Sequence, residues 1–220
     1  MYRYRKTIKE PFLTYSCAPT NLSDDEVQSR KSAITNRLGY ITIASIDPAV
    51  KNFAVRIEQR FTWKAAEYSA SDEPVILPIL FDKTNVGEGY AHLTDLLETI
   101  TPSLMTCDYI LVERQMPDNY QMVRVSQHCI SYCITALRKS EHYPLIIEID
   151  PKLKGKMLGA PPVTYHELKK WGVRKALEIC QERNDKASYD KLVATKKADD
   201  LADSLLQIEA WCQWLHQNFN

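Results

Sequence analysis

The sequence predicts an α/β fold in which helices flank a mixed sheet of five strands. Early in the chain, apolar runs rich in β-branched residues are separated by short turns, as in antiparallel sheets. Later runs are separated by segments with the 3.6-residue period of amphipathic helices, as in parallel sheets. We therefore expect three antiparallel strands followed by two parallel ones.

The five predicted strands share an apolar, β-branched or aromatic composition. In chain order they are Ile41–Asp47, Phe53–Arg60, one strand within residues 62–81, Tyr109–Gln115 and Pro144–Ile149. Two candidates remain open for the third strand, Val75–Phe81 and Trp63–Tyr68.

Five helices are predicted from apolar spacing and capping signals. They run from about Ser23 to Arg37, from Glu88 to Ile100, from Asn119 to Lys139, from Tyr165 to Arg183 and from about Ala198 to His216. The Asn119–Lys139 helix has apolar residues on more than one stripe, including Cys129, Tyr132 and Ile134, so it should pack on a second surface besides the sheet. That surface is either a second subunit or another part of the same chain.

Residues 1–39 are predicted to be an N-terminal extension, partly helical and partly flexible, before a domain of residues 40–220. The start of the extension, Tyr2–Lys9, is basic and aromatic. Such a segment fits a DNA-contacting arm, and it resembles a mitochondrial presequence only weakly because a Ser-rich amphipathic pattern is lacking.

The formal net charge of the 220-residue chain is zero, but the charges are unevenly distributed. Residues 61–118 have an excess of seven acidic side chains, and residues 151–197 have an excess of seven basic ones. A basic segment on a neutral protein suits a polyanionic partner such as DNA. The competing interpretation is that these lysine-rich helices are simply solvated surfaces.

The six cysteines are scattered and include no CxxC pair, so we expect free thiols rather than zinc ligands or disulfides. This usage indicates an intracellular, reducing compartment. The longest apolar run, Val75–Phe81, is interrupted by Pro78 and is far too short to span a bilayer, so we expect no membrane association. No secretory signal is visible at the N-terminus.

Four acids stand in positions where carboxylates are uncommon. Asp47 ends an apolar strand, Glu113 lies in another, and Asp200 and Asp203 are three residues apart on one side of a predicted helix. Capping of the helix explains Asp200 well but explains Asp203, a full turn further in, poorly. Clustered carboxylates are typical ligands of Mg²⁺ or Mn²⁺.

At these acids the sequence resembles the RuvC-like Holliday junction resolvases of the ribonuclease H-like superfamily, over roughly residues 41–216. The Lys-Asn-Phe-Ala ending of the first motif is most similar to the branch of fungal mitochondria, poxviruses and other large DNA viruses. Ala49 departs from the glycine of the bacterial proteins. The matching motifs are Ile46–Ala54 (IDPAVKNFA), Val112–Gln115 (VERQ), Pro151–Lys154 (PKLK) and Lys197–Leu205 (KADDLADSL).

The resemblance implies a ribonuclease H-like fold for residues 40–220 and Asp47, Glu113, Asp200 and Asp203 as metal ligands and catalytic residues. It also implies a catalytic lysine, best matched by Lys154, with Lys152 and Lys156 as alternatives. Asp199 would replace Asp200 if the helix register differs by one residue.

The activity implied is structure-selective cleavage of four-way DNA junctions by a homodimer, with Mg²⁺ as cofactor and Mn²⁺ as a possible substitute. The cut would be paired and symmetric, and the site of action would be either a viral replication site in the cytoplasm or a mitochondrion. Two alternatives remain: another ribonuclease H-like nuclease, or a DNA-binding protein without catalysis.

Overall fold

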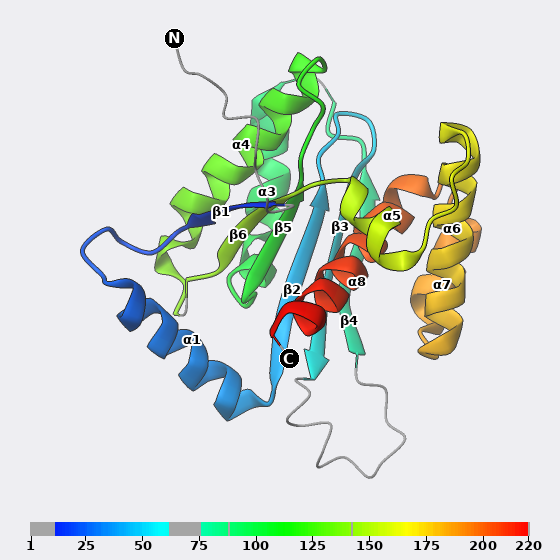
Figure 1. The fold of residues 1–220 in the computed structure, drawn as a ribbon. Coiled ribbons are helices and arrows are strands. Elements are labelled where there is room, and N and C mark those ends of the chain that lie inside the picture. The colour runs from blue at the N-terminus through cyan, green and yellow to red at the C-terminus, as the bar shows by residue number, and fades with distance from the viewer. Residues whose placement is uncertain (1–11, 62–75, 88, 142, 220) are drawn as a thin grey trace.

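The structure is a computed structural model that describes residues 12–61, 76–87, 89–141 and 143–219. Six strands form one mixed sheet in the order β1-β6-β5-β2-β3-β4 (Figure 1). The strands are β1 (Phe12–Ser16), β2 (Tyr40–Asp47), β3 (Phe53–Phe61), β4 (Ile76–Thr84), β5 (Tyr109–Glu113) and β6 (Leu145–Ile149). The β4 strand corresponds to the Val75–Phe81 candidate, and Trp63–Tyr68 lies outside the described residues.

The predicted topology is confirmed for five strands. β2, β3 and β4 pair antiparallel, whereas β5 and β6 run parallel to β2. The predicted count of five was one short, because β1 pairs antiparallel with β6 at the sheet edge. Five residues are too few to show a clear alternation, and β1 is held by distant contacts: Phe12 packs edge-on against Trp211 and Trp214, and the Tyr15 hydroxyl donates to Glu148. The division of the chain at residue 40 stays a prediction, but part of the first segment belongs to the sheet.

Each predicted helix is present, and two more appear. The helices are α1 (Asp24–Leu38), α3 (Tyr90–Leu104), α4 (Tyr120–Ala136, followed by the 3₁₀ turn Leu137–Lys139), α5 (Lys152–Leu158), α6 (Tyr165–Glu182), α7 (Lys186–Ala194) and α8 (Asp199–Phe219). The unpredicted ones, α5 and α7, have seven and nine residues and are too short for a clear amphipathic period.

The helices cover both faces of the sheet (Figure 1). On one face, buried side chains of β2 and β3 such as Ala44 and Val55 share a core with α3 and α4. On the other, Ile43 and Leu111 pack against Ile208 and Trp211 of α8. Because successive strand residues face opposite sides, strands covered on both faces are apolar throughout.

The extra apolar residues of α4 are covered within the chain. Tyr132 and Ile134 pack against the core shared with α3, and the Tyr132 hydroxyl lies 2.8 Å from the Thr101 hydroxyl of α3. Cys129 is fully buried. The second surface packed by α4 is therefore part of the same chain, and these residues carry no argument for a subunit interface.

A buried charged network joins β3 to the helical region. Arg56 is fully buried and donates to Glu58 at 2.5 Å, to Asp185 at 3.0 Å and to Ser188 at 2.8 Å. Arg60 bridges Glu58 and Glu209 of α8. Because each of these buried charges has an opposite charge beside it, the network holds α7 and α8 against the sheet.

The prediction of free thiols is confirmed. None of the six cysteines forms a disulfide in the part of the chain that the structure describes, and five of them are buried. Burial raises the pKa of the Cys17 thiol to about 11 and that of Cys133 to about 12, so these thiols are protonated and unreactive at neutral pH.

Candidate metal centre

Three of the four predicted acids meet at the carboxyl ends of the central strands β2 and β5. β2 and β5 are parallel neighbours, and Ile46 pairs with Val112, so Asp47 and Glu113 end up side by side. The helix α8 contributes Asp203 to the same group. One carboxylate oxygen of each acid lies within 4.8 Å of those of the other two.

Lys154 stands between two of these acids. Its Nζ lies 2.9 Å from Oε2 of Glu113 and 2.9 Å from Oδ1 of Asp203. The short helix α5 directly follows β6 and turns this side chain toward the acids, whereas Lys152 and Lys156 are exposed. Of the three candidate lysines, the structure thus brings only Lys154 into contact with the acids.

Gln207 is a site residue that the sequence analysis missed. Its amide nitrogen donates to Oε2 of Glu113 at 3.0 Å, and its carbonyl oxygen accepts from the Ser45 hydroxyl at 2.7 Å. Gln207 is buried and lies one turn after Asp203 on the same side of α8. That four-residue spacing from Asp203 is the signal that would have indicated it.

The carboxylates of Asp47, Glu113 and Asp203 repel one another. Burial raises the pKa of Asp47 well above its ordinary value, and the charges of Glu113 and Asp203 raise it further. The pKa of Glu113 is also raised by burial, although Lys154 opposes this. Burial would lower the pKa of Lys154, but the surrounding carboxylates outweigh it and raise the pKa. One lysine therefore faces three carboxylates, and the donor set of hard, clustered oxygens fits Mg²⁺ or Mn²⁺.

Asp200 lies next to this group without being part of it. Its Oδ2 is 3.7 Å from Nζ of Lys83, and it does not share the 4.8 Å spacing of the other three acids. Burial and the neighbouring Asp199 raise the pKa of Asp200. Asp199 pairs with Lys169 of α6 instead. The role of Asp200 as a ligand stays a prediction.

A basic cleft adjoins the acids. It has a cavity volume of about 670 Å³ and lies between the first turns of α6 and α8. The basic and histidine side chains in the lining are His166, Lys169, Lys170, Arg174 and Lys197, and Asp199 and Asp200 also line the cleft. Such a cleft can hold a polyanion with one of its phosphates next to the carboxylates.

The chain has the ribonuclease H-like fold expected from its sequence, and it shares this fold with two solved Holliday junction resolvases. The chain is similar to the fowlpox virus resolvase in its complex with a substrate Holliday junction, with a TM-score of 0.56, 17% identity and coverage of 82% of this chain and 100% of the other. It is also similar to the yeast mitochondrial Holliday junction resolvase Ydc2, with a TM-score of 0.53, 20% identity and coverage of 90% of each chain. Identities this low establish the fold and leave the activity to be argued from the site.

Curated relatives come from two viruses. Uncharacterized protein 97L of invertebrate iridescent virus 3 is 36% identical over 108 residues, which are 48% of this chain and 48% of the relative. Uncharacterized protein 170L of invertebrate iridescent virus 6 is 30% identical over 128 residues, 50% of this chain and 52% of the relative. The chain thus spans about half the length of the curated relatives it matches. No family model matches it.

Among the helices that the structure describes, none combines the length and apolar composition needed to cross a membrane.

Proposed function

We propose that this chain is a structure-selective DNA endonuclease that resolves four-way junctions by metal-dependent phosphodiester hydrolysis. The proposal depends on one observation: Asp47, Glu113 and Asp203 lie together at the ends of the central strands, in a fold shared with the fowlpox virus resolvase. The fowlpox and yeast proteins of the same fold are Holliday junction resolvases.

Asp47, Glu113 and Asp203 would hold Mg²⁺, or Mn²⁺ in its place, and Asp200 would complete the ligand set. When bound, such metal ions supply an activated water and stabilise the leaving oxygen of a phosphodiester. Gln207 holds the Glu113 carboxylate in one orientation through its amide. Lys154 would offer its ammonium group to the charge that develops on the scissile phosphate.

The basic cleft would hold the DNA backbone on either side of the scissile phosphate. Its cationic side chains belong to the basic residues 151–197, which lie beside the acids. Phosphate contacts release counterions, so junction binding should weaken steeply as salt rises, by about 10³-fold or more between 50 and 200 mM if six phosphates are contacted.

A homodimer is part of the proposal and is argued from the substrate. The two strands cut in a four-way junction are related by a two-fold axis, and one site cannot reach both at once. A C₂ dimer presents two sites with the same symmetry. Such a dimer should make paired, symmetric nicks that leave ligatable duplexes.

The test is incubation of the protein with a synthetic mobile four-way junction and with a matched linear duplex, each with and without Mg²⁺. Metal-dependent, paired cuts in the junction and none in the duplex are expected, with Asp47→Asn as the inactive control. Scattered nicks in both substrates would instead assign a general ribonuclease H-like nuclease. Tight junction binding without any cut would assign a non-catalytic DNA-binding protein.

A further inference from the structure

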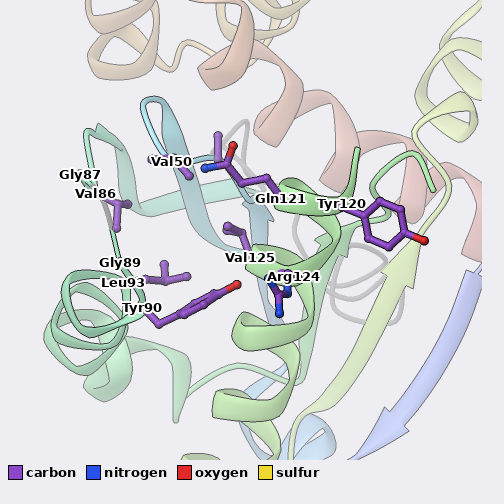
Figure 2. Close-up of a pocket in the computed structure, with 11 residues that line it drawn as sticks. Val50, Val86, Gly87, Gly89, Tyr90, Leu93, Tyr120, Gln121, Arg124 and Val125 are labelled. Carbon is purple, nitrogen blue, oxygen red and sulfur yellow. The ribbon is translucent and has the colours of Figure 1, made fainter. Parts of the chain in front are cut away.

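A second pocket is lined by Ala49 and Val50 of the turn between β2 and β3, whereas Asn52 of the same turn lines the basic cleft. Its cavity volume is about 440 Å³, within the range of small-molecule sites. The turn after β2, the loop between β4 and α3, and the first turns of α3 and α4 form its walls (Figure 2). The pocket has no part in the metal site or in the backbone contacts described above.

The pocket is fixed close to two of the acids. Val50, in its wall, follows Asp47 by three residues, so the chain between them spans at most about 11 Å. Val125, also in the wall, precedes Ser126, whose hydroxyl lies 3.5 Å from the Glu113 carbonyl oxygen. A nucleotide next to a phosphate held at the acids would therefore have its base within reach of this pocket.

The lining combines apolar walls with a few polar groups. Val50, Val86, Leu93 and Val125 supply the apolar part (Figure 2). Tyr90 extends from α3 toward Arg124 of α4, and Gln121 lies toward the turn that carries Val50, whereas Tyr120 points away (Figure 2).

The polar side chains are available to a ligand. Gln121 and Arg124 are exposed, and neither side chain has a hydrogen-bond or ion-pair partner among the described residues. The described lining residues include no acid. The apolar walls, the aromatic ring and the exposed amide and guanidinium groups suit a flat, apolar ligand with hydrogen-bonding groups at its edge.

We infer that this pocket receives a nucleobase of the cleaved strand, from a nucleotide adjacent to the scissile phosphate. The apolar walls and the Tyr90 ring would contact the faces of the base, and Gln121 and Arg124 would hydrogen-bond to its edge. A bare phosphate fits less well, since Arg124 is the one cationic side chain among the described lining residues. The inference rests on the proposed function, and it makes Gln121 and Arg124 the residues that set the sequence preference of cleavage.

The test uses junctions with one fixed crossover, in which each nucleotide flanking the cut is replaced in turn by an abasic one. For the wild-type protein, single-turnover cleavage should slow by about 10-fold or more at one position, the size expected from losing a stacked base. The double variant Gln121→Ala/Arg124→Ala should cut the intact junction about 10-fold more slowly than wild type does. Its cleavage rate should not fall further on the abasic junction, because the substitutions and the loss of the base remove the same contact. Gln127→Ala, an exposed change one turn further along α4, should match wild type.

A second readout needs no cleavage. With 2-aminopurine at the sensitive position and no metal, wild-type binding should change the fluorescence, and the double variant should not. Two outcomes would overturn the inference while leaving the proposed function intact. In one, no abasic position slows cleavage; in the other, the rate losses from the abasic nucleotide and from the double variant multiply. A fall in sedimentation mass for the double variant would show that a second copy of the chain occupies the pocket instead. A protein that cuts no junction would refute the proposed function, and an unchanged 2-aminopurine signal would then refute the pocket as well.

Discussion

At the scale of single residues, the cluster of Asp47, Glu113 and Asp203 destabilises the folded protein when no metal is bound. Asp47 is buried beside two other carboxylates, and among the described residues Lys154 is the cation that contacts this group. In a buried setting, like charges this close oppose folding, whereas a bound divalent cation reverses the balance.

Replacement of Asp47 should therefore have opposite effects on stability and activity. Asp47→Asn removes one of the repelling charges, so the metal-free variant should melt at a higher temperature than wild type. It should also lose the stabilisation that Mg²⁺ confers on wild type, and it should bind junctions without cutting them. Calorimetric melting with and without Mg²⁺ measures the first two effects, and a lower metal-free melting temperature would contradict the account.

Lys154 should act on rate rather than on binding. Lys154→Ala is expected to slow single-turnover cleavage by about 10²–10³-fold, the size of one lost electrostatic contact in a transition state. Lys152→Ala is the control, because Lys152 is exposed and does not contact the acids. Equal losses for the two variants would mean that Lys154 has no special role.

At the scale of elements, the start of α8 decides where Asp200 and Asp203 stand. Lys83 of β4 contacts Lys196 and Lys197, which lie just before α8. Its ammonium group donates to the carbonyl oxygen of Lys197 at 2.6 Å and to that of Lys196 at 3.4 Å. Lys197 has a positive φ of 57°, a conformation that non-glycine residues seldom adopt and that needs support from its surroundings.

Removal of this support should loosen the start of α8. For Lys83→Met, we expect the amides of residues 198–203 to exchange hydrogen about 10-fold faster or more, the scale of a lost hydrogen bond to a charged group. Exchange measured by mass spectrometry without metal tests this independently of activity. Lys191→Met is the matched control, since it removes only the exposed ion pair with Asp82. The same exchange rates in both variants would contradict the role of Lys83.

At the scale of the whole molecule, the buried network around Glu58 joins the sheet to the helices that carry the basic cleft. Burial alone would raise the pKa of Glu58, but the charges of Arg56, Arg60 and Arg183 outweigh it and lower the pKa from 4.5 to about 2. A carboxyl whose pKa is lower in the folded state stabilises folding above its unfolded pKa. That stabilisation is lost as the pH falls from about 4.5 toward 2.

Glu58→Gln should therefore destabilise the protein at neutral pH by about 3–5 kcal/mol, the usual effect of breaking a buried ion pair. The difference from wild type should narrow as the pH falls through the same window. Urea unfolding at pH 7, 4 and 3 measures both effects. Glu178→Gln, at an exposed pair with Lys175, should leave the unfolding free energy nearly unchanged. A difference that is independent of pH would rule out the charge of Glu58 as the cause.

Period and composition in the sequence predicted five of the strands, their topology and the five longer helices, because these signals depend on neighbours in the chain. The same signals marked four acids as candidate ligands. Asp47 and Glu113 stood out locally as charges within apolar strands. The tertiary structure alone decided that Asp203 joins them while Asp200 pairs with Lys83, that Lys154 rather than Lys152 or Lys156 meets the acids, and that Gln207 orients Glu113. It also decided that β1 completes the sheet. Each of these outcomes depends on side chains far apart in the chain, and contacts of that kind leave no local period in a sequence.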